Sequence, residues 1–182
     1  MTASPTPAGP VLIGWKEYLD LPELGLSRFK IKVDTGARTS ALHVTSMEVG
    51  PEQPDGTAEV SFEIPLDRGG ERTVRASATV LRQVKVTDSG GTSSVRPVIR
   101  TEMVLGPVRK PILITLTDRT DRMFRMLLGR KALEGDFVVD VAKRYLTGGG
   151  PQTTAAHPGT PSTGESPRGD TAKRSTAPGG TS

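Results

Sequence analysis

The sequence predicts an all-β protein, a sandwich or a closed barrel, with one short helix toward the end of its folded part. Apolar residues alternate with polar ones in several runs, as at 29–33, 60–66 and 74–86, which is typical of strands that bury one face. Clusters of Gly, Pro and Asp, as at 50–56 and 67–70, separate the runs and predict turns. Short strands between frequent turns favour a sandwich or a barrel.

The elements follow one another in chain order. Residues 21–25, LPELG, predict a loop or a single turn, and the first clear strand is at 29–33, where apolar residues alternate with lysines. The alternation at 60–66 predicts a second strand, and the run at 74–86 predicts a longer one.

The second half of the core contains a long hairpin at 84–100 with a glycine-rich tip, at which Gly90 and Gly91 supply positive φ angles. Such a hairpin is either a lid over a cleft or an ordinary hairpin. Further strands are expected at 112–116 and 137–139. Between them, GRKALEG at 129–135 predicts a short helix, because good helix formers precede a terminal glycine.

Composition divides the chain into three parts. Residues 1–10 are a short flexible lead-in, and residues 11–147 form one domain. The 35 residues at 148–182 include 24 Gly, Pro, Ser or Thr, and their only aliphatic residues are four alanines. A segment of this kind cannot bury enough apolar surface to offset its chain entropy, so a disordered tail is predicted.

The composition also excludes several functional classes. The core has 21 Lys and Arg against 18 Asp and Glu, and its arginines are scattered with few aromatic residues, so no nucleic-acid partner is expected. The chain has no cysteine and no stretch of 18 apolar residues, so neither thiolate chemistry nor a membrane span is expected. It also lacks the pattern of a secretory signal, and a cytoplasmic location is the default expectation.

No cofactor or metal is expected from the motifs. The two histidines, His43 and His157, form no HExxH pair, and the second lies in the predicted tail. The sequence has no P-loop, no GxGxxG motif and no GxSxG motif, so neither a recognised nucleotide site nor a nucleophilic serine is indicated.

The candidate catalytic residues are Asp34, Thr35 and Gly36, which follow the strand at 29–33. Two carboxylates that share one proton can activate water at an amide carbonyl, because neighbouring like charges cannot both ionise. Asp-Thr-Gly suits one half of such a pair: the strand delivers the carboxylate, Thr offers a hydroxyl, and Gly lets a backbone N–H approach. Asp34 could equally be the first residue of an ordinary turn.

A second motif gives the chain a family resemblance. Leu127-Leu128-Gly129-Arg130 runs into the predicted helix, and together with Asp34-Thr35-Gly36-Ala37 and the glycine hairpin it resembles a retropepsin. The blocks GWKEYLDLPELGLSRFKIKVDTGARTSALH, RPVIRTEMVLG, ITLTDRTDRMFRMLLGRKAL and FVVDVAKRYLTG are similar to the RimB-like, RimK-associated retropepsin-type peptidases, over nearly all of 11–147.

The resemblance implies a retropepsin-like fold and an aspartic endopeptidase, in some members linked to the ligase RimK, which adds glutamates to a ribosomal protein. A RimK-type ligase is therefore an expected partner. The family is also labelled "ATP-dependent zinc protease", but the sequence contains neither a zinc ligand set nor a nucleotide motif.

A symmetric homodimer is expected, because the core holds only one strand-loop-strand unit and each chain would supply one Asp34. The resemblance implies that Thr35 of each chain braces the opposite loop. The second Asp-Ser-Gly, at 88–90, lies at the hairpin tip rather than after a buried strand, so it is rejected as the other half of the pair.

The expected substrate-binding residues are Ala37, Arg38, Gly90, Gly91 and Arg130. Retroviral proteases usually place an acidic residue after DTGA, where this chain has Arg38. Arg38 and Arg130 could face one pocket, and the hairpin adds Arg96 and Arg100, although alternation permits either face. Guanidinium groups clustered in one cleft would favour a glutamate-rich peptide or protein substrate. The alternatives are that these arginines lie on solvated faces or pair with structural carboxylates. Two rival functions are a non-catalytic module that binds a glutamylated partner or the ligase, and a metal-dependent hydrolase.

Overall fold

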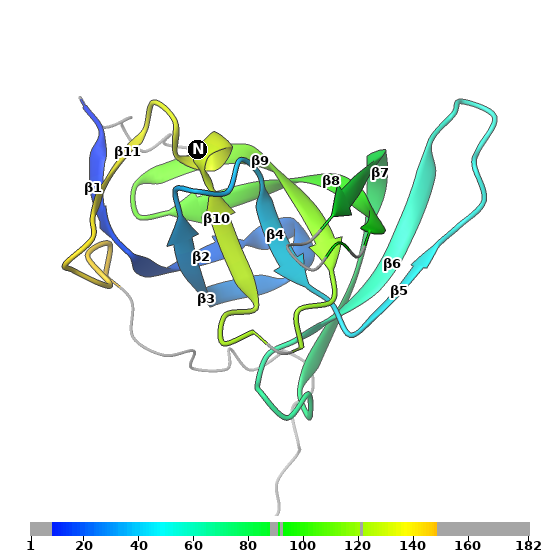
Figure 1. Cartoon of the computed structure of the whole chain (residues 1–182), viewed down its shortest axis with the longest axis horizontal. Helices are drawn as coiled ribbons and strands as arrows, with labels where there is room; N and C mark the ends of the chain where they lie inside the picture. Colours follow the sequence, from blue (N-terminus) through cyan, green and yellow to red (C-terminus); the bar gives the residue numbers. More distant parts are fainter. Residues whose placement is uncertain (1–8, 88–90, 92, 121, 149–182) are drawn as a thin grey trace, which may run out of the picture. The chain divides into compact units, whose positions relative to one another are not determined.

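Strands make up most of the described part of the chain in the computed structural model (Figure 1). The structure describes residues 9–87, 91, 93–120 and 122–148. Most of the predicted lead-in, the predicted tail from residue 149 onward, and Gly90 lie outside the described residues. Among those described, no helix is long and apolar enough to cross a membrane.

The elements are β1 (Val11–Gly14), β2 (Lys16–Leu21), the short 3-10 helix η1 (Pro22–Leu24), β3 (Leu26–Asp34), β4 (Ser40–His43), β5 (Ser46–Val49), β6 (Ala58–Pro65), β7 (Thr73–Thr87), β8 (Ser93–Leu105), β9 (Val108–Thr117), β10 (Met126–Gly129), α1 (Arg130–Leu133) and β11 (Phe137–Asp140). The all-β prediction is confirmed. The expected strands and the expected short helix are present, and LPELG forms the single turn η1.

The main sheet closes on itself. Its strands pair in the order β2-β3-β10-β4-β9-β8, and Asp20 of β2 pairs with Val104 of β8, so these strands form a ring. Beyond β8 the sheet continues through β7 and β6 to β5, whereas β1 and β11 form a separate parallel pair.

The alternation of apolar and polar residues fills the hydrophobic core. Phe29, Ile31 and Val33 of β3 are buried, while the residues between them are exposed. Strand β6 likewise buries Val60 and Phe62. Burial of one such side chain stabilises the fold by about 1.5–3 kcal/mol, so the period-two pattern fixes which face of each strand is internal.

One strand is inserted between two strands that are consecutive in the chain. Figure 1 shows β10 between β3 and β4, parallel to β3 and antiparallel to β4. The pairing sets Leu128 opposite Val33 and Gly129 opposite Asp34. The loop that joins β3 to β4 must therefore pass over the end of β10, which places the predicted catalytic loop beside the second motif.

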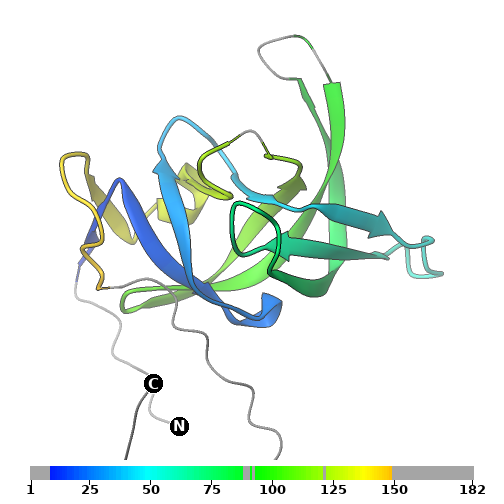
Figure 2. The same cartoon turned by 90° about the horizontal axis from the view of Figure 1, so that it is seen from below.

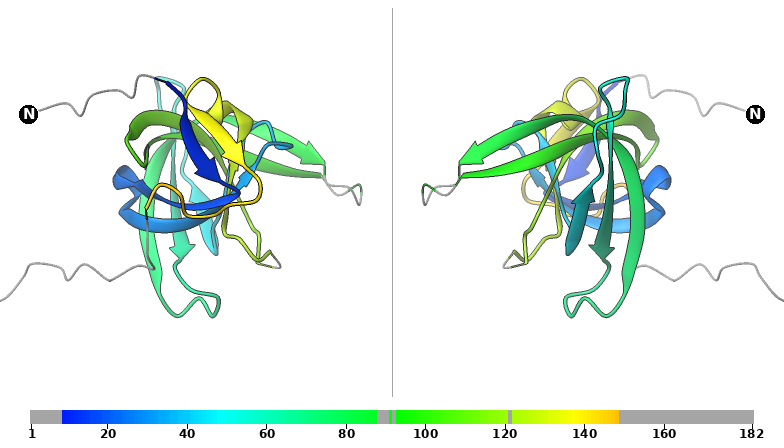
Figure 3. Two further views of the ribbon diagram at one scale, coloured as in Figure 1. Left: turned by 90° about the vertical axis from the view of Figure 1, so that its left-hand side faces the viewer. Right: turned by 90° about the vertical axis from the view of Figure 1, so that its right-hand side faces the viewer.

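The hairpin of β7 and β8 extends away from the ring (Figures 2 and 3). Gly91, near its tip, has φ +84°, as expected from the sequence. Positive φ is readily adopted by glycine because glycine lacks a Cβ.

A buried carboxylate joins the two ends of the domain. Glu17 of β2 is 1% exposed, and its Oε1 accepts N–H bonds from Gly14 (2.6 Å) and Leu146 (2.8 Å). Its Oε2 accepts bonds from the N–H (3.4 Å) and the hydroxyl (3.0 Å) of Thr147. The segment after β11 is thereby fixed against the start of β2.

Candidate active site

Asp34 is the last residue of β3, where the buried strand ends and the loop 35–39 begins. Its side chain is half-buried, between the buried Val33 and the exposed Thr35 and Gly36. The strand thus carries a carboxylate from the interior of the ring to its rim, where a substrate can reach it.

The loop folds back onto this carboxylate. Oδ1 of Asp34 accepts the N–H groups of Gly36 and Ala37, each at 3.1 Å. A Cβ at position 36 would lie 3.3 Å from the same oxygen, which is tighter than most contacts, and this explains the glycine. Among the described residues, Oδ2 takes part in no hydrogen bond, so one oxygen is held and the other is free to react.

The second motif fixes the other side of the loop. The backbone N–H of Arg130 donates to the carbonyl of Ala37 (2.9 Å), and that of Lys131 donates to the carbonyl of Arg38 (3.1 Å). The guanidinium of Arg130 makes a long hydrogen bond to the carbonyl of Thr35 (3.4 Å). The first turn of α1 therefore uses its free N–H groups to position the loop.

Gly129 allows the loop and β10 to meet. A Cβ at Gly129 would lie 2.5 Å from the carbonyl carbon of Thr39, so no larger residue fits. The N–H of Gly129 donates to the hydroxyl of Ser40 (3.1 Å), whose carbonyl accepts a bond from Thr115 of β9 (2.9 Å). These contacts connect the loop to three strands of the ring.

A hollow of about 340 Å³ lies between this loop and the β7–β8 hairpin, and we call it the hairpin hollow. Its lining residues are Ala37, Arg38, Thr39, Ala41, Arg82, Val84, Val86, Arg96, Val98, Thr115, Arg119 and Leu127. Four of these are arginines and none is a carboxylate. Because guanidinium groups bind carboxylates through paired hydrogen bonds, the hollow suits an acidic ligand.

The expected substrate-binding residues are placed differently from one another. Ala37 and Arg38 line the hairpin hollow, whereas Arg130 holds the loop through Thr35 and does not line it. Gly91 is exposed near the hairpin tip and does not line it either. Gly90 lies outside the described residues. Among the described carboxylates, none pairs with Arg38.

Two arginines of the hollow were missed from the sequence. Arg82 lies opposite Val98, and Val84 lies opposite Arg96, so these four side chains share one face of the hairpin. Alternation along the expected strand could have placed Arg82 beside Val84. Arg119 follows β9, and no local pattern connects it with the loop at Asp34.

Arg119 is the most confined of these arginines. Burial lowers the pKa of its guanidinium, the neighbouring Arg122 and Arg96 lower it further, and Asp34 opposes them. Its Nε is buried without a hydrogen-bond partner among the described residues. The guanidinium remains charged at neutral pH because its ordinary pKa is so high.

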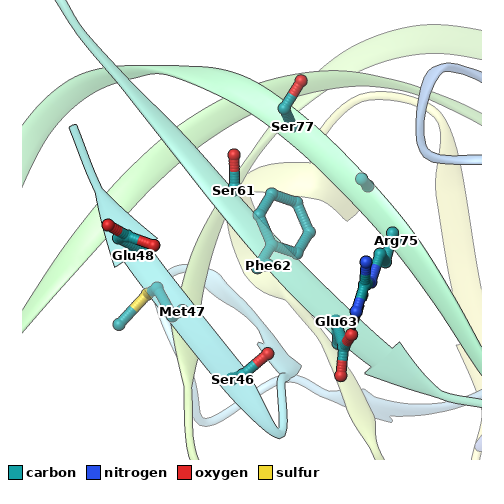
Figure 4. Close-up of a pocket in the computed structure, with 9 residues that line it drawn as sticks. Ser46, Met47, Glu48, Ser61, Phe62, Glu63, Arg75 and Ser77 are labelled. Carbon is teal, nitrogen blue, oxygen red and sulfur yellow. Dashed lines mark hydrogen bonds and ion pairs between the residues drawn. The ribbon is translucent and has the colours of Figure 1, made fainter.

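A larger hollow, of about 730 Å³, lies on β5, β6 and β7 (Figure 4). Its charged residues are Glu48, Glu63 and Arg75, and the last two form an ion pair of 2.6 Å. None of its lining residues belongs to the Asp34 loop or to the hairpin hollow, so it is separate from both.

Metal ligands do not gather at any of these places. Within the described ranges, no group of three His, Cys, Asp or Glu side chains could hold a metal ion. The residues present therefore do not fit the zinc in the family label, and no step is derived through a metal.

An Asp-Thr-Gly loop at the end of a strand, held by an inserted parallel strand that ends in Gly-Arg, defines a retropepsin-like fold. The chain belongs to the RimB-like family: residues 12–149 match the family model described as "Retropepsin-like aspartic endopeptidase RimB". The resemblance seen in the sequence is thus confirmed.

Curated relatives carry a different name. A "Probable alpha-L-glutamate ligase" of Parasynechococcus marenigrum is 40% identical over 131 residues, which cover 71% of this chain and 28% of the relative. A protein of the same name from Desulfotalea psychrophila is 37% identical, with 75% of this chain and 29% of the relative covered. The chain thus spans less than a third of the length of these relatives.

A solved structure supports the fold. The crystal structure of Lpg0085, a Legionella pneumophila protein of unknown function, aligns with a TM-score of 0.62 and 25% identity. The alignment covers 75% of this chain and 97% of the other.

Proposed function

We propose that the protein is an aspartic endopeptidase that acts as a homodimer and cleaves acidic, glutamate-rich protein segments. The observation that carries this proposal is the Asp34 carboxylate, with one oxygen fixed by two N–H groups and the other free, beside a hollow with four arginines.

In the proposed reaction, Asp34 of one chain and Asp34 of a second copy share one proton. The ionised carboxylate removes a proton from water as the water oxygen attacks the peptide carbonyl. The protonated carboxyl donates its proton to the carbonyl oxygen, which gives a gem-diol intermediate. The carboxyl that took the proton from water then gives it to the amide nitrogen, while one hydroxyl of the intermediate returns a proton to the other carboxylate. The C–N bond breaks to release an amine and a carboxylic acid. The N–H groups of Gly36 and Ala37 would fix the orientation of each carboxylate.

The proposed substrate class follows from charge. Four guanidinium groups around about 340 Å³ favour several carboxylates and disfavour a basic peptide. The relatives' name, probable alpha-L-glutamate ligase, supports glutamate chemistry and a RimK-type ligase as a partner.

The test compares glutamate-rich and neutral peptides with purified protein, and measures the oligomeric state by sedimentation at the assay concentration. We expect faster cleavage of the acidic peptide, a weaker preference at high salt, and activity only in the dimer. An active monomer would contradict the dimeric mechanism. Binding without cleavage would support a non-catalytic module, and inhibition by a chelator would support a metal-dependent hydrolase.

A further inference from the structure

A second arginine-rich hollow, of about 530 Å³, lies between the β6–β7 turn at 66–72 and the loop that follows β9. Its lining residues include four arginines, Arg68, Arg119, Arg122 and Arg125, and one carboxylate, Asp67. We call it the turn hollow. Like the hairpin hollow, it has an excess of positive charge among the described residues.

The one carboxylate of the turn hollow is already bound. Oδ2 of Asp67 accepts the Nε–H of Arg72 at 3.2 Å, and Oδ1 accepts the backbone N–H of Glu71 at 3.0 Å. By contrast, none of the four arginines forms an ion pair with a described carboxylate. Their charge is available to a ligand.

The two hollows follow one another along a single face of the sheet. Ala41 of β4 and Leu127 of β10 line the hairpin hollow. Two residues further in the same direction, His43 of β4 and Arg125, which directly precedes β10, line the turn hollow. Because side chains two positions apart point to the same face, the hollows are separated by about 6–7 Å along the strands.

Arg119 lines both hollows. Its Nε is buried and has no hydrogen-bond partner among the described residues. Burial also lowers the pKa of Arg125, which Asp67 opposes and Arg68 reinforces. Arg119 thus lies near Arg122 and Arg96, and Arg125 lies near Arg68, so like charges are close together before any ligand is present.

We propose that the turn hollow is a second carboxylate-binding site, which holds acidic residues of the substrate about two positions beyond those in the hairpin hollow. This inference rests on the proposed function and extends it: the enzyme would select for a run of acidic residues rather than for a single one. Alternate side chains of an extended peptide are about 6–7 Å apart, which matches the separation of the hollows.

An acidic polypeptide suits these sites better than a nucleic acid does. No Phe, Tyr or Trp lines either hollow, whereas sites for single-stranded nucleic acid usually offer aromatic side chains for base stacking. The turn hollow is also continuous, through Arg119, with the hollow beside Asp34, where peptide chemistry is proposed.

The experiment measures binding rather than cleavage, with full-length protein that carries Asp34→Asn so that no peptide is cut. Fluorescence anisotropy would give Kd for labelled oligoglutamates of about two and about ten residues. The shorter peptide cannot fill both hollows, because adjacent side chains of an extended peptide point to opposite faces. The double variant Arg68→Gln/Arg122→Gln removes two exposed charges from the turn hollow. Arg100→Gln, an exposed arginine that lines neither hollow, is the matched control.

We expect the double variant to weaken the long peptide about tenfold and the short peptide less than about twofold. The control should change neither Kd. Equal losses for both lengths, or no loss, would overturn the second site even if the protein cleaves acidic peptides. Tighter binding of an oligonucleotide of equal charge, lost in the same variant, would overturn the carboxylate assignment. A length-dependent loss in a protein that cleaves nothing would contradict the proposed function and leave the second site standing.

Discussion

Glu17, near the domain ends, and Asp34, at the rim of the ring, both accept backbone N–H groups, but of these two only Glu17 has both oxygens hydrogen-bonded among the described residues. Each carboxylate oxygen of Glu17 accepts two hydrogen bonds, and the residue is 1% exposed. Asp34 is half-buried, and only its Oδ1 accepts bonds from described residues. A saturated carboxylate stabilises structure, whereas a carboxylate fixed through one oxygen can still exchange a proton.

The largest expected effect is on catalysis. Asp34→Asn should lower kcat/KM for an acidic peptide by about 10²–10⁴-fold, because an amide cannot accept the proton of water. The free energy of unfolding should change little, since the amide oxygen can still accept the bonds from Gly36 and Ala37. Asp136→Asn, in which the carboxylate lost is the partner of Lys110, is the control and should retain activity. A fully active Asp34→Asn enzyme would show that Asp34 has only a structural role in the turn.

Glu17→Gln should lower the stability of the fold, whereas Asp34→Asn should lower catalysis. The amide group would turn two donors toward the N–H and hydroxyl groups that now donate to Glu17, at a cost of about 2–4 kcal/mol in the free energy of unfolding. Urea denaturation would measure this. The exposed Glu134→Gln, which removes an ion pair with Lys131, should change stability by less than about 0.5 kcal/mol. Equal effects of the two substitutions would mean that Glu17 is not essential to the joined ends.

The surroundings of the two carboxylates differ as well, because arginines gather beside Asp34. Arg38→Gln should raise KM for a glutamate-rich peptide about three- to tenfold and leave KM for a neutral peptide unchanged, since one charge-assisted contact is lost. Steady-state kinetics at low and high salt would test this. An equal rise for both peptides would point to a disturbed loop rather than to recognition of charge.

The smallest expected effect concerns His43, a buried side chain that also accepts a backbone N–H. Its Nδ1 accepts the N–H of Arg119 at 2.8 Å, and burial lowers the pKa of His43 although Asp118 opposes the shift. The unfolded chain therefore binds a proton more readily than the folded one.

It follows that the contribution of His43 to stability is complete above pH about 6.5 and is lost as the pH falls through the lower pKa of the folded state. Thermal melts between pH 8 and 5 should show a smaller decrease in Tm for His43→Asn than for the native chain. Parallel curves would show that His43 does not titrate differently in the two states.

The alternation of apolar and polar residues was sufficient to predict the strands that bury one face with apolar residues alone, such as β3 and β6. It failed at β2, where the buried Glu17 interrupts the apolar pattern although Leu19 and Leu21 follow it. It also failed at β4, whose four residues are all buried and show no period. A local pattern reveals a strand only when the buried residues are apolar and the exposed residues between them are polar.

The sequence by itself determined the all-β class and the short helix, because residue types at these positions meet local demands of turns and strand ends. The association of the Asp34 loop with the Gly129-Arg130 motif was implied by the resemblance to retropepsins. Only the tertiary structure decided that β10 lies parallel to β3, so that Gly129 is opposite Asp34. It also decided that Arg38, Arg82 and Arg119 line one hollow. Strand pairing over such separations depends on how the whole sheet closes, and no local period in the sequence records it.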